Sequence, residues 1–220
     1  MGIGKTDDKI YNESCEVKNR LLNIFMTSMR LTKGGDEMGK KVLVIVGSPR
    51  RGGNSDAMAD AFTRGAETAG AEVRRINVSE LKIKACTACE QCWESDRPCV
   101  FQDDMEKAYP LIEWADMFVF AFPLYYYTYP AQLKMFIDKL FPYEVRHTEA
   151  TKDKETALLA CGGTDDPSEF DGLVSTYRIT CGFKGWKGKG VLCAHGLNSR
   201  DDILNTDWQE KARQLGESLG

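Results

Sequence analysis

Four continuous apolar runs constrain the fold of this 220-residue chain more than any other feature. The runs are KVLVIVG (41–47), DMFVFAF (116–122), TALLACGG (156–163) and GVLCAHG (190–196). A strand that is apolar at successive positions is buried on both faces, which is typical of parallel sheets covered by helices. The runs therefore predict four central strands of an α/β protein.

The segments between these runs have helical periodicity. They cover residues 55–70, 103–115 and 130–141, part of 168–185, and the C-terminal end of the chain. A shorter and more polar strand, EVRRINV (72–78), follows the first helix. Strands and helices alternate, so we predict a doubly wound, five-stranded parallel sheet with helices on both faces. With 42% hydrophobic residues the chain can bury a substantial core.

The first 39 residues differ from the rest of the chain. Apolar residues mark one side of a short predicted helix at Leu21, Leu22, Phe25, Met26 and Met29. The polar, glycine-containing segment TKGGDEMGKK (32–41) follows. We therefore predict an arm or leader at 1–39 and one folded domain at 40–220. The alternative is that the helix packs on a partner subunit.

The composition excludes several classes of partner and location. The net charge of −4, from 29 basic and 33 acidic residues, offers no general attraction to nucleic acid or anionic membranes. No apolar run approaches the ~18 residues that a membrane span requires. Eight cysteines without a secretion signal predict a reducing, cytoplasmic location. In that compartment, clustered cysteines are metal ligands or redox groups more often than disulfides.

The loop after the first strand, GSPRRGGNS (47–55), has the features of a phosphate site. Its glycines let backbone amides approach an anion, and the following helix presents its N-terminus. Side-chain donors and positive charge come from Ser48, Arg50, Arg51, Asn54 and Ser55. The loop matches neither GxxxxGK[ST] nor GxGxxG, which argues against nucleotide hydrolysis and a standard dinucleotide site. The alternative is a polar turn with a good helix cap.

Two further loops follow predicted strands at the same edge of the sheet. PLYYYTYP (123–130) places four tyrosines within five positions, which suits a flat aromatic ligand. The alternative, packing against the next helix, is expected for at least one of the four. CGGTDDP (161–167) supplies a glycine pair that permits close approach to a ligand.

Four cysteines occur within fourteen residues in the pattern C-x2-C-x2-C-x6-C. They are Cys86, Cys89, Cys92 and Cys99. Thiolates at this spacing suit an iron–sulfur cluster, although the pattern differs from the ferredoxin run. Zinc, a disulfide, and thiols that bind nothing permanently remain alternatives.

Taken together, these motifs resemble the NAD(P)H-dependent FMN reductase and iron–sulfur flavoprotein family over roughly residues 40–220. The matching segments are GSPRRGGNS, CxxCxxC…CVFQDDM and ADMFVFAFPLYYYTYPAQLKMFIDKL. The resemblance implies a flavodoxin-like sheet in the order 2-1-3-4-5, bound FMN, and a homodimer or homotetramer.

The resemblance also implies positions for the cofactor. The residues expected on the FMN phosphate are Ser48, Arg50, Asn54 and Ser55. Those expected along the isoalloxazine ring are Pro123, Leu124, Tyr125 and Tyr126. Gly162 and Gly163 are expected near the other edge of the ring, and the four clustered cysteines are candidate ligands of a 4Fe-4S cluster.

The function that this resemblance implies is an FMN-dependent NAD(P)H oxidoreductase. Electrons would pass from the nicotinamide through FMN to a quinone, an azo or nitro compound, or free flavin. One alternative is an electron carrier with FMN and a 4Fe-4S cluster, served by a ferredoxin-like protein. Another is a flavin-binding redox sensor without turnover. The sequence specifies neither the electron acceptor nor a preference for NADH over NADPH.

Overall fold

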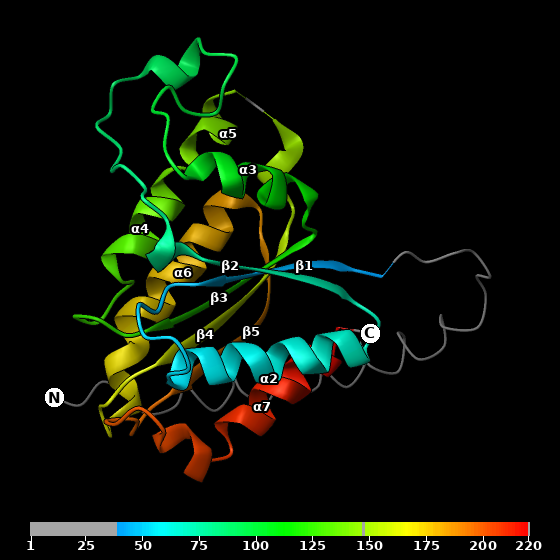
Figure 1. Cartoon of the computed structure of the whole chain (residues 1–220), viewed down its shortest axis with the longest axis vertical. Helices are drawn as coiled ribbons and strands as arrows, with labels where there is room; N and C mark the ends of the chain where they lie inside the picture. The colour runs from blue at the N-terminus through cyan, green and yellow to red at the C-terminus, as the bar shows by residue number, and fades with distance from the viewer. Residues whose placement is uncertain (1–38, 147, 220) are drawn as a thin grey trace, which may run out of the picture. The chain divides into compact units, whose positions relative to one another are not determined.

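The computed structural model describes residues 39–146 and 148–219 (Figure 1). Residues 1–38, which include the helix expected around Leu21 to Met29, lie outside this described part of the chain. Within it, five strands form one sheet: β1 (Lys41–Val46), β2 (Glu72–Asn77), β3 (Met117–Pro123), β4 (Glu155–Cys161) and β5 (Lys187–Ala194). The order is β2-β1-β3-β4-β5, and every neighbouring pair is parallel. The predicted fold class and strand order are confirmed.

Helices cover both faces of the sheet (Figure 1). One face carries α3 (Met105–Trp114), α4 (Ala131–Asp138), α5 (Phe141–Val145) and α6 (Asp171–Lys184). The other carries α2 (Asn54–Thr68) and α7 (Trp208–Glu217). Short 3-10 turns lie at Val78–Glu80, Gln91–Trp93, Glu149–Thr151, Pro167–Phe170 and Asp202–Asn205.

Alternate residues of each central strand enter two separate cores. In β1, Val42 and Val44 pack on the α2/α7 side, whereas Leu43 and Ile45 pack beneath α3 and its neighbours. Burial of each such side chain contributes about 1.5–3 kcal/mol. The two-sided burial explains why the strand sequences are continuously apolar.

Close packing of α2 against α7 fixes the position of the helix that follows β1. A Cβ atom added at Gly65 would lie 2.0 Å from the carbonyl oxygen of Arg213. One added at Gly216 would lie 2.2 Å from the carbonyl oxygen of Phe62. The two backbones therefore touch where side chains are absent, and α2 is held firmly with its N-terminus at the carboxyl edge of the sheet.

In the described part of the chain, the helices are too short or too polar to span a bilayer.

Candidate functional site

Loops after four strands meet at the carboxyl edge of the sheet, where the order reverses between β1 and β3. We call them the β1 loop (47–53), the β3 loop (124–130), the β4 loop (162–166) and the β5 loop (195–203). They enclose a cavity of about 150 Å³. Nine of the ten predicted FMN-site residues line it: Ser48, Arg50, Asn54, Ser55, Pro123, Leu124, Tyr125, Gly162 and Gly163. The tenth, Tyr126, lines an adjoining cavity of about 380 Å³ that shares Leu124, Tyr125 and the glycine pair.

The β1 loop leads directly into the uncapped N-terminus of α2. Gly53, the N-cap residue, is extended and has no side chain, and within residues 39–146 and 148–219 this end of the helix has no side-chain cap hydrogen bond. Ser48 and Ser55 are buried beside it, and the Ser48 hydroxyl accepts from the Arg50 amide at 3.2 Å. Gly52 adopts a left-handed φ of 64°, a conformation that glycine takes without strain. Free helix amides and buried hydroxyls at one point form a cradle that fits a phosphate group.

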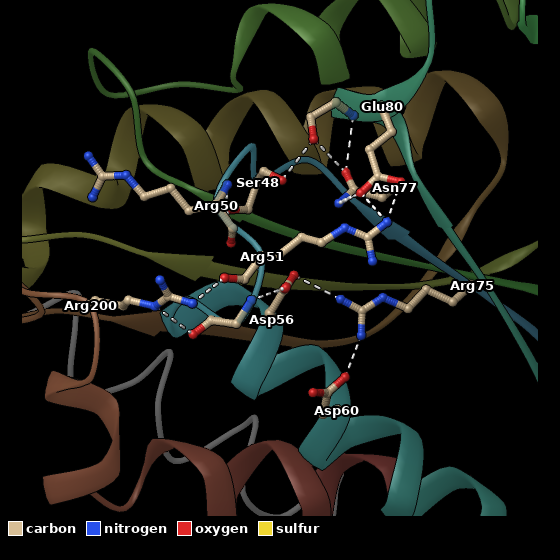
Figure 2. Close-up of polar contacts among 11 residues, drawn as sticks. Ser48, Arg50, Arg51, Asp56, Asp60, Arg75, Asn77, Glu80 and Arg200 are labelled. Atoms are coloured by element: carbon tan, nitrogen blue, oxygen red, sulfur yellow. Dashed lines mark hydrogen bonds and ion pairs between the residues drawn. The ribbon is translucent and has the colours of Figure 1, made fainter.

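A buried carboxylate holds the β1 loop from behind (Figure 2). Asp56 Oδ2 accepts from the Gly52 amide at 2.6 Å, and Asp56 Oδ1 accepts from Arg75 Nη2 at 2.8 Å. Arg75 also pairs with Asp60, one turn further along α2. The carboxylate thus fixes the loop before any ligand binds, and Arg75 compensates its charge.

Three further arginines around this loop differ in their partners (Figure 2). Arg51 pairs with Glu80 at 2.5 Å, a contact that raises the pKa of its guanidinium. Arg200 of the β5 loop donates to the carbonyl oxygen of Arg51 at 2.7 Å and to that of Gly52 at 3.4 Å. Within residues 39–146 and 148–219, the Arg50 guanidinium has no carboxylate within salt-bridge distance. Because Arg51 is paired with Glu80 and Arg200 donates to backbone carbonyls, Arg50 is the one of these three whose guanidinium has no partner among the described residues.

The side chain of Asn54 is directed to the β5 loop. Its amide nitrogen donates to the carbonyl oxygen of Ser199 at 2.8 Å, and its amide oxygen accepts from the Ile203 amide at 3.4 Å. The sequence predicts a side-chain contact between Asn54 and phosphate, whereas these bonds leave the backbone amide as its free donor. Asn54 instead joins the β1 and β5 loops into one wall.

The β5 loop was missed in the sequence analysis. Leu197, Asn198, Ser199 and Arg200 all line the smaller cavity. The available signal was the polar segment HGLNSR directly after the apolar run GVLCA, because parallel strands place all such segments at one edge.

The tip of the β3 loop is a two-residue turn made by bulky residues in the left-handed region. Tyr125 and Thr128 exchange backbone hydrogen bonds at 3.2 and 3.1 Å, while Tyr126 and Tyr127 between them have φ values of 45° and 61°. Non-glycine residues at such angles are strained. At this turn Tyr126 is 96% exposed to solvent. Tyr129, by contrast, is buried and packs on Phe122 of β3 at 5.1 Å between ring centroids.

The glycine pair of the β4 loop forms a surface without side chains. A Cβ atom at Gly162 would lie 2.9 Å from Phe170 Cζ, and one at Gly163 would lie 2.7 Å from Asn198 Oδ1. A larger residue at either position would displace these neighbours. The pair also lines both cavities, so its backbone faces the space between the β3 and β4 loops.

The four clustered cysteines lie in a separate place, in residues 85–102, which we call the cysteine loop. Apart from the short turn Gln91–Trp93, this loop has no regular structure. All four thiols are free and line one cavity of about 240 Å³, together with Trp93, Phe101 and Phe141. Partial burial is the main cause that raises the pKa of Cys92, and the charge of the neighbouring thiols raises it further.

The cysteine cavity does not have the geometry of a single-ion site. Among the described residues, no three His, Cys, Asp or Glu side chains converge on a point that could hold one metal ion. Tetrahedral zinc draws its sulfurs to about 2.3 Å from one centre, whereas a cluster holds them around a larger body. Four thiols around one shared cavity fit the donor set of an iron–sulfur cluster better than that of zinc.

An open α/β sheet with an anion cradle at its switch point and a flat aromatic cavity beside it defines a flavodoxin-like flavoprotein. Comparison with known sequences makes this assignment specific. The profile described as NADPH-dependent FMN reductase matches residues 40–169, more than half of the chain. The chain belongs to this FMN-binding family of oxidoreductases.

Individual relatives carry two kinds of name. An iron–sulfur flavoprotein from Archaeoglobus fulgidus is 34% identical over 179 residues, covering 81% of this chain and 78% of that protein. An FMN-dependent NADH:quinone oxidoreductase from Pseudoalteromonas atlantica is 23% identical, covering 80% and 96%. Among solved structures, an NAD(P)H:quinone oxidoreductase from Methanothermobacter marburgensis superposes with a TM-score of 0.67 at 21% identity, covering 82% of this chain and 96% of that one. The structural likeness supports the fold alone.

Proposed function

We propose that this chain is an FMN-dependent oxidoreductase whose cysteine loop holds a 4Fe-4S cluster in electron exchange with the flavin. The observation that carries the proposal is the placement of four free thiols around one cavity, without single-ion geometry, in a chain with an FMN-type cradle. The likeness to an iron–sulfur flavoprotein at 34% identity supports it.

The cradle at α2 would bind the FMN phosphate. Ser55 and the amides of the first helical turn would donate to its oxygens, and Arg50 would offset its charge. The Ser48 hydroxyl, which donates to the Arg50 carbonyl oxygen at 3.3 Å, would turn to the phosphate. Asp56 and Arg200 would hold the loop in shape through their hydrogen bonds with its backbone. Bound FMN would supply the capacity to take up and release two electrons.

The ring would lie between the β3 and β4 loops. The backbone of Pro123 to Tyr126 would border one edge, and Gly162 and Gly163 the other. The tyrosines at the tip would exclude water from one side of the cavity and leave the other open to a second reactant.

A short helix extends from the β3 loop to the cysteine cavity. Helix α4 begins immediately after Pro130 and ends at Asp138, next to the cysteine cavity. Eight helical residues span about 12 Å. The fold therefore joins the two sites through one helix rather than through a flexible linker.

Purification without oxygen tests the proposal directly. The expected result is FMN together with about four irons and matching acid-labile sulfide per chain. Cys89→Ser should lose most of the iron and retain FMN. The matched control is Cys193→Ser, at a partly buried thiol of β5 outside the cysteine loop. Wild-type protein that binds FMN but takes up no iron on reconstitution would contradict the cluster.

A second candidate function is supported by the larger cavity at the β3 loop. We infer direct oxidation of NAD(P)H with reduction of a small aromatic acceptor such as a quinone, azo or nitro compound. The cavity of about 380 Å³ between exposed tyrosines and the glycine pair can receive a planar ring. Steady-state oxidation of NADH and NADPH with a quinone tests it, and no turnover with FMN bound would contradict it. Homo-oligomer formation, a ferredoxin-like partner and a cytoplasmic location stay predictions.

A further inference from the structure

Lys139 is a buried cation whose nearest side-chain partner is a thiol. It follows the last residue of α4 and is 2% exposed. Its Nζ donates to Cys99 Sγ at 3.1 Å and lies 3.4 Å from Asp103 Oδ2. It also lies 4.9 Å from the centroid of the Phe101 ring. Lysine is rarely buried to this extent unless it is paired, so its surroundings need to supply a counter-charge.

Asp103 supplies that counter-charge only in part. Its Oδ2 also accepts from the Lys84 amide at 2.9 Å, and its Oδ1 accepts from the Met105 amide at 2.9 Å. The carboxylate is thus engaged in anchoring the end of the cysteine loop to α3. The 3.4 Å separation from Lys139 is longer than a normal charge-assisted hydrogen bond.

The contact with Cys99 is weak if its sulfur is a neutral thiol, because a thiol is a poor acceptor. It becomes strong if the sulfur carries negative charge, as it does when it ligates a metal cluster. The geometry therefore matches a state in which Cys99 is a thiolate ligand, and Lys139 lines the same cavity as all four cysteines.

The backbone at Lys139 is fixed as firmly as its side chain. Its amide donates to the carbonyl oxygens of Met135 and Phe136 at 3.2 Å each, which ends α4. The Nζ position is consequently set by a helix rather than by the irregular cysteine loop. A residue on a helix can orient a ligand on an irregular loop.

We propose that Lys139 is a positioning residue of the cysteine site, which orients Cys99 and supplies positive charge that raises the reduction potential of the cluster. The inference rests on the proposed cluster. Reduction adds negative charge to the site, and a desolvated cation with an N–H···S hydrogen bond stabilises the reduced form more than the oxidised form.

Redox titration of the reconstituted full chain tests the inference. The variants are Lys139→Met, Lys139→Gln and Lys139→Arg. The matched control is Lys134→Met on the same helix, an exposed lysine paired with Asp138. FMN, iron and sulfide contents are measured with the cluster potential followed by electron paramagnetic resonance.

At a fixed solution potential, the Met and Gln variants should have a ratio of reduced to oxidised cluster at least tenfold lower than wild type. For a one-electron couple this equals a drop in reduction potential of about 59 mV. The Arg variant and the Lys134→Met control should have cluster potentials close to that of wild type. Loss of iron in the Met variant, with FMN retained and with iron kept in the Arg variant, would also support the inference. The Gln variant, which keeps a polar group without the charge, serves if the Met variant does not fold.

Full iron content with an unchanged potential in both neutral variants would overturn the role of Lys139 and leave the cluster standing. Wild-type protein that binds FMN without iron would overturn both the cluster and this inference, while the second candidate function would survive. The two failures are therefore distinguishable by iron content alone.

Discussion

The β1 loop and the cysteine loop are both candidate cofactor sites, but they are organised in opposite ways. The β1 loop has seven residues, and its shape is fixed by Asp56, Arg200 and the start of α2. The cysteine loop has eighteen residues, and Cys86 and Cys89 within it are exposed. The first site is held in shape by protein groups alone, whereas we expect the second to gain order when a ligand joins its four thiols.

The difference follows from the ligands that each site would take. A phosphate is bound by donors that must already point inward, so preorganisation increases affinity. A metal cluster contributes covalent bonds of its own and can therefore order a loop as it binds. Lys139 and Asp103, the two residues that hold the cysteine loop, lie outside it at its base.

Removing the support of the β1 loop should give the largest effect. Asp56→Ala leaves Arg75 and the Gly52 amide without their partner, and we expect a loss of about 2–3 kcal/mol in unfolding free energy. FMN affinity should fall with it, because the phosphate cradle loses its shape. Chemical denaturation and fluorescence titration with FMN measure the two effects.

Asp60→Ala is the matched control for that prediction. It removes the exposed partner of the same arginine, so we expect a change of about 0–1 kcal/mol. Equal effects of the two substitutions would show that the β1 loop does not depend on Asp56.

Cluster loading should protect the cysteine loop from proteolysis, whereas FMN alone should not. Chymotrypsin should cleave the iron-free chain after Trp93, which is exposed. Reconstitution with iron and sulfide should slow this cleavage by about tenfold or more. Mass spectrometry of the fragments gives the rates, with FMN-loaded, iron-free protein as the control. Equal rates with and without iron would mean that the loop is already ordered.

A smaller effect is expected at the tip of the β3 loop. Tyr126→Gly removes the strain of a left-handed tyrosine and should raise the free energy of unfolding by about 1 kcal/mol. The aromatic surface is lost, so the KM for a planar acceptor should rise. Tyr125→Gly is the control, since Tyr125 lacks a positive φ and gains no relief. A destabilised Tyr126→Gly variant would contradict the strain.

The smallest effect is expected for Glu80→Gln in the pair with Arg51. Both side chains are substantially exposed, and exposed ion pairs contribute little to stability. We expect no measurable change in melting temperature or FMN affinity, in contrast to Asp56→Ala. A clear loss of FMN binding would show that Arg51, rather than Arg50, requires precise positioning at the cradle.

The apolar and helical patterns of the sequence determined the layers and the loops that form the edge site, whereas the strand order was expected only from the resemblance to a known family. Continuous apolar runs can be satisfied only between two helical layers, and parallel strands bring their carboxyl ends to one edge. Ser48, Ser55 and the Gly162–Gly163 pair could therefore be assigned to one cavity before the structure was known.

Only the tertiary structure decided which side chains are paired and which are free. Arg50 and Arg51 are neighbours in the sequence, yet the turn of the β1 loop directs Arg51 alone to Glu80. Lysine is a residue type expected at the solvated surface, but packing buries Lys139 against Cys99, forty positions away. Such pairings depend on distances between elements remote in the chain, which periodicity and motif spacing do not encode.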